Sequence, residues 1–398
     1  MKDLKYRLYC LLHYTAKRIR GRLSLTTGKI LCPFSFNMGV ESMNAVEIWN
    51  NFIRKSVQYS GEYNGLLYAG FIAENKKWCL PSWIWTSSAI VRELCFIGKR
   101  NNAYALVNKL LACQQECGGW IVRNDYDKKG AIPMLAPNDS AYIANNAFLT
   151  LYEQTYDDKY LNIARRCADW IIETASPDGM VYVGYNMRDK KWDKNCVIVD
   201  VGFTAGLFAR LVEFTNEEKY LIFLKRFVER YIELFYIPSK HGFCTSIDKN
   251  NNHQGGGMFG RGQAWALEGL IPAYKVLKDE QIKEVIEETV DNLIRLQLKN
   301  GGWSYNFAKP LLGEDCKSVS VIAKDMMEWY AISKDKRIRN SAERALMWCC
   351  EHTAIEGEAV GGIFSFCMEG AIVKNLYSSC AFVYSSAYAI ELYDMLKK

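Results

Sequence analysis

The sequence is poor in the patterns that mark metal-binding, membrane and nucleic-acid-binding proteins. It has only four histidines, and none stands with cysteines at the spacing of a zinc site, so we expect no metal ion. No run of 18 apolar residues is present, which predicts that no segment spans a membrane. The net charge of +6 is a mild excess that does not by itself indicate a nucleic-acid partner.

The 14 cysteines are scattered through apolar stretches rather than paired at CxxC spacing. In a short secreted chain such a number would indicate disulfides. In this chain of 398 residues, positions such as Cys95, Cys167, Cys349 and Cys380 are typical of free thiols, which behave as small buried apolar groups. Free thiols persist in a reducing compartment, so we expect a cytoplasmic protein.

The first 40 residues differ from the rest of the chain. Residues 1–25 alternate basic residues with Leu and Tyr, and they lack the apolar stretch and the cleavage site of a signal peptide. We interpret residues 1–40 as a basic leader, either solvated, disordered, packed on the following domain, or amphipathic and in contact with a membrane surface. Residues 41–398 are expected to form a single domain.

Glycine turns recur along this domain at nearly constant spacing. Each turn is a glycine followed by an apolar residue, and the steps between the glycines are 60, 63, 60 and 60 residues. The turns are Gly119-Trp120, Gly179-Met180, Gly242-Phe243, Gly302-Trp303 and Gly362-Ile363. Repetition at this period indicates stacked copies of one supersecondary unit.

Each period predicts two helices. The first is amphipathic, with one apolar stripe, and we expect the glycine turn to cap its C-terminus. The second is apolar on nearly all sides and is therefore expected to be buried. The predicted buried helices are 86–97, 140–152, 201–214, 262–276, 319–332 and 378–392, and the first amphipathic helix is 46–59. Six such pairs predict an all-α fold, an (α/α)6 barrel with the buried helices inside.

The residues at the starts of the inner helices carry the functional signal. They are Trp85, Asp139, Asp200, Arg261, the pair Lys317-Ser318, and Tyr377-Ser378. The steps from Asp139 to Asp200 and from Asp200 to Arg261 are both 61 residues, so these side chains are expected to meet at one mouth of the barrel. Two carboxylates near an arginine and aromatic rings suit sugar chemistry. The alternative is that both aspartates only cap their helices.

The segment Phe259-Gly-Arg-Gly-Gln-Ala-Trp resembles the W-x-R-G-Q-x-W signature of glycoside hydrolase family 88, the unsaturated glucuronyl hydrolases. Family 105, the unsaturated rhamnogalacturonyl hydrolases, carries a related version. These families are (α/α)6 barrels whose two catalytic aspartates precede successive inner helices. The resemblance extends from about residue 83 to 392, and it is most specific in this segment.

The resemblance implies a role for each matching residue. Asp200 would be the general acid and base and Asp139 its partner. The residues implied to line the sugar subsites are Trp85, Asn138, Phe259, Arg261, Gln263, Trp265 and Tyr377. Asn138 stands where the family usually has a histidine, and His253, in a glycine-rich loop, is a candidate to replace a family histidine. The implied substrate is an unsaturated uronic acid at the end of an oligosaccharide, hydrated at its C4=C5 double bond without a cofactor.

Three other functions compete with this interpretation. A sugar or uronate epimerase or lyase on the same barrel would use Tyr142, Tyr377 or His253 as its base. Terpene cyclases share a Q-x3-G-x-W pattern with residues 114–120 and 297–303, but the sequence has no D-x-D-D or D-D-x-x-D motif, so a structural role for these turns is favoured. A non-catalytic carbohydrate-binding protein is favoured if both aspartates are caps that point away from the mouth.

Overall fold

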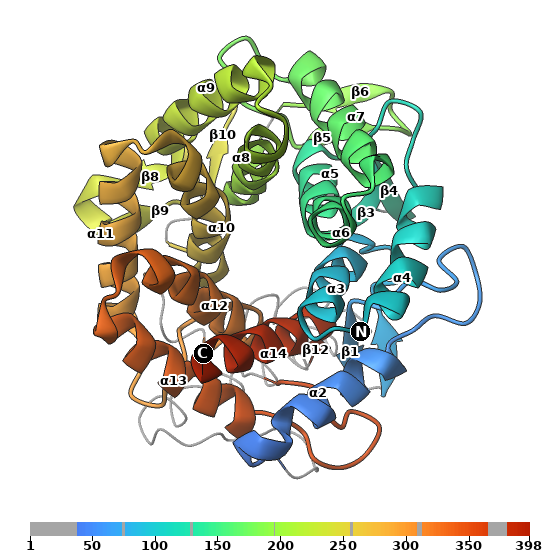
Figure 1. The fold of residues 1–398 in the computed structure, drawn as a ribbon, viewed down its shortest axis with the longest axis vertical. Coiled ribbons are helices and arrows are strands. Elements are labelled where there is room, and N and C mark those ends of the chain that lie inside the picture. The colour runs from blue at the N-terminus through green and yellow to red at the C-terminus, as the bar shows by residue number, and fades with distance from the viewer. Residues whose placement is uncertain are drawn as a thin grey trace, which may run out of the picture.

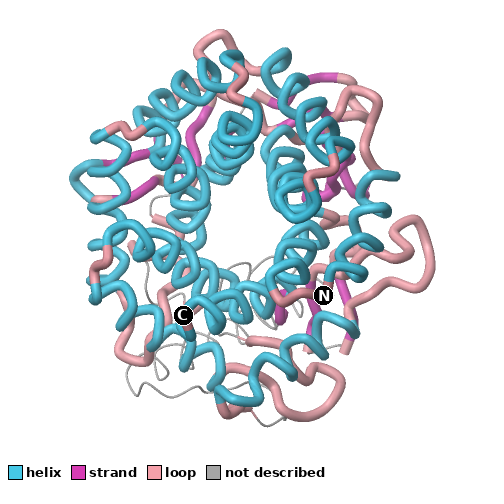
Figure 2. Tube along the Cα trace, viewed as in Figure 1, coloured by secondary structure: helices cyan, strands magenta, loops and turns pink. Residues whose placement is uncertain are grey.

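The computed structural model describes residues 38–73, 76–127, 130–194, 196–254, 258–308, 313–364 and 380–398. Within these ranges the chain is an (α/α)6 barrel, as predicted. An inner ring of helices is surrounded by an outer ring, and the chain alternates between the two (Figure 1). Short strands connect the end of an outer helix to the start of the next inner one, so they gather at the mouth where the inner helices begin (Figure 2).

The inner helices are buried on nearly all sides, as their apolar sequences predict. They are α3 (Trp85–Phe96), α5 (Pro137–Ile143) continued by the π-helical segment η1 (Ala144–Leu149) and α6 (Thr150–Thr155), η2 (Val199–Gly202) continued by α8 (Phe203–Thr215), α10 (Gly260–Leu277), α12 (Cys316–Ser333) and α14 (Val383–Lys397). The outer helices are α2 (Ser42–Lys55), α4 (Arg100–Ala112), α7 (Asp158–Thr174), α9 (Glu218–Phe235), α11 (Glu280–Leu296) and α13 (Lys336–Glu351).

Three of the polar turns that lead from an inner to an outer helix, those before α7, α11 and α13, share one local design. The inner helix ends in a residue with left-handed backbone, such as Tyr156 (φ 54°) or Lys278 (φ 54°). The next residue is an aspartate that caps the outer helix: Asp157 accepts a hydrogen bond from the backbone N–H of Lys159 (3.0 Å), and Asp279 caps α11 in the same way. At these three turns the two helices are therefore joined by a short corner whose backbone groups are hydrogen-bonded within the turn.

The glycine turns do not cap the outer helices, and this part of our prediction is wrong. α11 ends at Leu296, whereas the glycine with positive φ, Gly301, follows several residues later (φ 92°). A Cβ on Gly301 would lie 2.3 Å from the carbonyl oxygen of Arg344 on α13, the next outer helix. The turn needs glycine because it packs directly on a neighbouring helix, which also explains why the glycines recur with the period of the barrel.

The residues of the two Q-x3-G-x-W turns have the structural role that we favoured. Gln297 donates a hydrogen bond to the carbonyl of Gly301 (2.8 Å) and another to that of Ser341 on α13 (2.9 Å). The indole of Trp303 is fully buried and donates to the carbonyl of Leu293 (2.8 Å). The turn is therefore hydrogen-bonded both to α11, which precedes it, and to α13, the next outer helix.

A small antiparallel sheet closes the barrel. β1 (Gly70–Ile72) lies between β2 (Lys77–Cys79) and β12 (Cys380–Phe382), which joins the first turn of the barrel to the last. The other strands are β3 (Ile121–Asp127), β4 (Gly130–Leu135), β5 (Gly184–Asn186), β6 (Lys191–Asp193), β7 (Cys196–Ile198), β8 (Tyr236–Ile237), β9 (Gly242–Phe243), β10 (Ser246–Asp248) and β11 (His253–Gln254).

Several helix boundaries differ from the prediction by a few residues, among them the starts of the first outer and the last inner helix. The first outer helix begins at Ser42 rather than at 46, and the last inner helix begins at Val383 rather than at 378, because 380–382 pair with β1 as a strand. The predicted leader, except for its last residues, and Tyr377 lie outside the described residues, and the division at residue 40 stays a prediction. No helix in the described ranges is long and apolar enough to cross a membrane.

Candidate active site

A cavity of about 310 Å³ lies at the mouth where the inner helices begin. It brings together three of the charged side chains that the sequence placed at helix starts: Asp139, Asp200 and Arg261. The remaining lining is mostly aromatic and comprises Trp83, Trp85, Tyr142, Phe203, Phe259, Trp265, Tyr305, Tyr384 and Tyr388, with Ile198, Thr245 and Val321. The equal steps of 61 residues therefore do correspond to a shared location.

Neither aspartate occupies an N-cap position. The N-cap of α5 is Ala136, and Asp139 is the third residue of the helix, only 6% exposed. The N-cap of η2 is Ile198, and Asp200 is the second residue of that turn. Both carboxylates also line a smaller cavity of about 100 Å³, together with Asn138, that adjoins the first one. The two aspartates thus share one cavity wall.

The aromatic rings that line the cavity with these two carboxylates pack against one another. On one side Trp85 packs against Tyr384 and Tyr142, with ring centroids 5.1 and 5.8 Å apart. On the other side Phe259 contacts Trp265 at 5.6 Å in an edge-to-face arrangement. Flat aromatic surfaces of this kind bind the apolar faces of sugar rings, and here they form a continuous wall.

The guanidinium of Arg261 is held in the cavity by two neighbours. It lies over the ring of Trp265, 4.3 Å from the centroid, and it donates a hydrogen bond to the hydroxyl of Tyr384. Arg261 and Trp265 are four residues apart on α10, so they lie on the same face of that helix. The positive guanidinium of Arg261 is therefore held at the mouth where the N-termini of the inner helices also carry positive partial charge. Both features favour the binding of an anionic group of a ligand.

Two of the predicted site residues do not reach the cavity. Gln263 is 1% exposed and braces the backbone: its side chain accepts from Phe243 N (2.7 Å) and donates to Phe243 O (2.9 Å). His253 lies on the exposed strand β11, where its Nε2 is 3.0 Å from the carbonyl oxygen of Leu234. Neither prediction as a lining residue holds, because both side chains point elsewhere.

Tyr384 is a cavity residue that the sequence analysis missed. It is the second residue of α14, the position that Arg261 occupies in α10, and it binds Arg261. The apolar pattern of this helix runs back beyond its true start, so the predicted start at 378 lies five residues too early. A strand that pairs with β1 has no separate signal in the sequence at that point.

Two tyrosines form the floor of the cavity. The hydroxyl groups of Tyr142 and Tyr388 are hydrogen-bonded to each other, and Tyr388 donates to Glu268 (3.1 Å). Burial raises the pKa of both phenols above the ordinary value. Both hydroxyls therefore stay protonated at neutral pH and serve as hydrogen-bond donors rather than as bases.

Comparison with known proteins agrees with this geometry. The sequence model of Glycosyl Hydrolase Family 88 matches residues 121–392, which include both aspartates and the Arg261 segment. The chain belongs to glycosyl hydrolase family 88. No curated protein sequence matches the chain significantly.

Solved structures of similar fold include several sugar enzymes. An unsaturated glucuronyl hydrolase from Bacillus sp. GL1, responsible for the degradation of glycosaminoglycan, superposes with a TM-score of 0.69 at 13% identity, covering 90% of this chain and 97% of that one. A sugar epimerase from a ruminal bacterium has a TM-score of 0.69 at 14% identity, covering 89% and 97%. A possible GH105 member from Salmonella enterica has 0.65 at 13%, covering 90% and 95%. At such identities the likeness shows the fold.

Proposed function

We propose that this member of family 88 hydrates the C4=C5 double bond of an unsaturated uronic acid at the end of an oligosaccharide and thereby releases the next sugar. The observation that carries the proposal is the shared location of Asp139 and Asp200, in one aromatic cavity with the guanidinium of Arg261. Sugar-cleaving chemistry needs a carboxyl group that donates a proton and a carboxylate that stabilises charge, within reach of the same ring.

In the proposed reaction the carboxyl group of Asp200 donates its proton to C4 of the unsaturated ring. The positive charge that forms at C5 is shared with the ring oxygen. A water molecule gives a proton back to the Asp200 carboxylate and adds to C5, which produces a hemiketal. The hemiketal opens to a ketone at C5, and the resulting hemiacetal at C1 releases the neighbouring sugar, so one water is consumed overall.

The other residues of the cavity have supporting roles in this proposal. Asp139, which shares the wall with Asp200, supplies negative charge close to the developing cation. Arg261 binds the carboxylate of the uronic acid, because a guanidinium pairs with a carboxylate through two hydrogen bonds. Trp85 and Trp265 face the ring from two sides of the cavity. The N-termini of the inner helices add further attraction for the acidic sugar.

An epimerase or lyase has less support from the same cavity. Such an enzyme on this barrel would need a base, and His253 lies outside the cavity. Tyr142 does line it, but burial raises the pKa of its phenol and keeps it protonated. A purely carbohydrate-binding role is also less favoured, since the two aspartates are not N-caps.

The proposal is tested by incubating the protein with unsaturated uronyl disaccharides and following the absorbance of the conjugated double bond. Hydration removes this absorbance and, in D2O, places one deuterium at C4 of the product. A disaccharide with the same linkage and a saturated uronic acid is the matched control and should remain intact. Loss of the saturated substrate, or epimerisation of either sugar without loss of absorbance, would overturn the proposal.

A further inference from the structure

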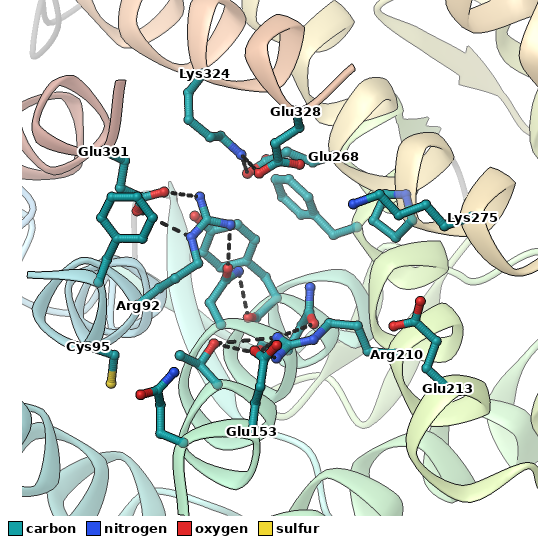
Figure 3. A pocket seen from close by; sticks show the side chains of 18 of the residues that line it. Arg92, Cys95, Glu153, Arg210, Glu213, Glu268, Lys275, Lys324, Glu328 and Glu391 are labelled. Carbon is teal, nitrogen blue, oxygen red and sulfur yellow. Dashed lines mark hydrogen bonds and ion pairs between the residues drawn. The ribbon is translucent and has the colours of Figure 1, made fainter. Parts of the chain in front are cut away.

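The charged cavity at the C-terminal ends of the inner helices has a volume of about 400 Å³. Many of its charged side chains pair with one another (Figure 3). Arg92 donates two hydrogen bonds to Glu391 (3.2 and 2.9 Å) and one to Asn146 (3.0 Å). Lys324 on α12 forms an ion pair with Glu268 on α10 (3.5 Å). These pairs link neighbouring inner helices, so we attribute the charged cavity to the stability of the barrel.

The smaller cavity beside the two aspartates, of about 100 Å³, has a different character. It shares Asp139, Asp200 and Ile198 with the cavity of the candidate active site. A substituent of a sugar that is bound in the larger cavity can therefore extend past the two carboxylates into the smaller one. The reaction proposed above uses these carboxylates but no other part of the lining.

Most of the lining of this smaller cavity is apolar. The apolar residues come from strands and from the starts of two inner helices, and they are Val122, Met134, Ala136, Val183, Ile198 and Val201. Val122 and Met134 lie directly opposite each other on β3 and β4, so their side chains stand together on the face of the sheet that borders the cavity. Such a surface gains free energy from contact with an apolar group.

Asn138 is the uncharged polar residue in this lining. It is the second residue of α5 and only 7% exposed, and its carboxamide takes part in no hydrogen bond within the described part of the chain. A carboxamide carries two N–H donors and an acceptor oxygen, and a buried polar group without a partner is costly. A ligand group that forms hydrogen bonds with Asn138 removes that cost.

Size and charge restrict what the smaller cavity can hold. A water molecule takes about 30 Å³ in the liquid, so a cavity of about 100 Å³ holds a group of roughly three or four heavy atoms. A sulfate or a carboxylate would lie against the wall that carries Asp139 and Asp200, where like charges repel. An ammonium would pair with the same carboxylates and neutralise the charge on which the reaction depends. A hydroxyl would leave the apolar walls without contact.

We propose that this smaller cavity binds an acetyl group carried by the substrate. The carbonyl oxygen of the acetyl group accepts an N–H of Asn138, and its methyl group contacts the apolar walls. The acetyl group belongs either to an N-acetylated amino sugar next to the uronic acid or to an O-acetylated uronic acid, because both present the same carbonyl and methyl. The inference rests on the reaction proposed above and names a substrate class for it.

Three unsaturated disaccharides with the same linkage test the proposal. The first joins the unsaturated uronic acid to a hexose, the second joins it to the corresponding N-acetylhexosamine, and the third is the first with an O-acetyl group on the uronic acid. One of the two acetylated compounds should have a kcat/KM about ten-fold or more above that of the first, since a fitting pocket discriminates a small apolar group by this factor. The preferred compound identifies the sugar that carries the acetyl group. Equal kcat/KM for all three would overturn the proposal.

Variants of the cavity wall should change this preference. Asn138→Leu keeps the size of the side chain but removes its hydrogen-bonding groups, and it should reduce the preference several-fold. Val183→Phe places a ring in the cavity and should abolish the preference, and it serves alone if Asn138→Leu does not fold, because Val183 is partly exposed. Val183→Ala enlarges the cavity and should extend the preference to a propionyl group. Glu358→Gln, on the exposed surface, is the control and should keep the preference. A preference that persists in folded Val183→Phe contradicts the proposal.

Calorimetric binding separates this inference from the proposed reaction. Saturated forms of the three disaccharides bind without turnover. Tighter binding of one acetylated form by the unchanged protein, lost in Val183→Phe, supports the acetyl site even if no unsaturated disaccharide is hydrated. Hydration of all three unsaturated disaccharides at equal rates, with equal affinity for the three saturated forms, rejects the acetyl site and leaves the reaction in place.

Discussion

The hydroxyl of Tyr388 donates a hydrogen bond to Glu268, 3.1 Å away, and is bonded on its other side to the hydroxyl of Tyr142. Because Tyr388 uses its proton on Glu268, Tyr142 must be the donor between the two phenols. One short chain of hydrogen bonds therefore runs from the floor of the candidate active site into the charged cavity behind it. Burial of all three side chains makes this chain important for stability.

Replacing Tyr388 by phenylalanine tests this connection. The variant leaves Oε1 of Glu268 without its hydroxyl donor and Tyr142 without its acceptor. We expect a loss of about 1–3 kcal/mol in the free energy of unfolding, measured by denaturant titration. Tyr156→Phe is the matched control, since Tyr156 is 78% exposed and its change should be close to zero. Equal stability of the two variants would show that the buried chain contributes nothing.

Glu93 on α3 predicts a pH dependence of stability. Its side chain is fully buried, both carboxylate oxygens lack a hydrogen-bond partner among the described residues, and burial together with nearby Glu391 raises its pKa from 4.5 to about 8. The folded state therefore holds a proton that the unfolded chain releases above pH 4.5. Stability should fall as pH rises from 4.5 to 8, by roughly 3 kcal/mol at pH 7.

Glu93→Gln should remove this dependence. We expect the variant to match the unchanged protein near pH 4.5 and to exceed it at pH 8, in denaturant titrations at several pH values. Glu358→Gln, on the exposed surface, is the control and should follow the unchanged protein throughout. If the stability of Glu93→Gln falls with rising pH as steeply as that of the unchanged protein, the pH dependence arises from another group.

The packing of the glycine turns predicts that Gly301→Ala lowers the stability more than Gly357→Ala does. Gly301→Ala places a Cβ 2.3 Å from the Arg344 carbonyl in a backbone with φ 92°, whereas Gly357→Ala has φ 75° and no atom within 4 Å. The second should cost about 1–2 kcal/mol from its backbone alone, and the first clearly more, since α13 must also move. Thermal or denaturant unfolding measures both, and equal losses would contradict the packing role of Gly301.

The barrel itself was predictable from the sequence, because several repeats place a glycine directly against the backbone of an outer helix, as Gly118, Gly301 and Gly361 do, and these glycines therefore recur at the period of the fold. The position of Gln263 was predictable in principle as well. Residues advance by about 100° along a helix, so Gln263, two positions after Arg261, faces away from the cavity, and Trp265, four positions after, faces the same way as Arg261. The helical period therefore argues against the lining role that the family signature implies for Gln263.

Other features had weaker signals. Tyr384 was missed because the start of its helix depends on a strand pairing between residues far apart in the chain, β1 and β12. The cavity at the C-terminal ends of the inner helices does have a signal in the sequence: Arg92, Glu268 and Lys324 are charged residues in the interior of helices that are mostly buried. Which of them face one another depends on the closure of the barrel, so no local pattern could have paired them.

The role proposed for Arg261 predicts a specific kinetic change. Arg261→Lys keeps the charge but loses the planar pair of donors, so kcat/KM for an unsaturated uronyl disaccharide should fall about 10- to 100-fold. Gln263→Met is the contrasting variant: loss of its bonds to Phe243 should lower stability, while the folded enzyme keeps kcat/KM within about three-fold. The reverse result would place the carboxylate contact on Gln263.

The most direct test of the account is the activity of Asp200→Asn on an unsaturated uronyl disaccharide, followed by the absorbance of the double bond. We expect rapid loss of absorbance with the unchanged protein. We expect at least a 1000-fold slower loss with the variant, since about 10²–10⁴-fold comes from general acid–base catalysis and the same carboxyl acts twice. Circular dichroism should show an unchanged fold. Turnover by a folded Asp200→Asn protein at a comparable rate would contradict the central claim.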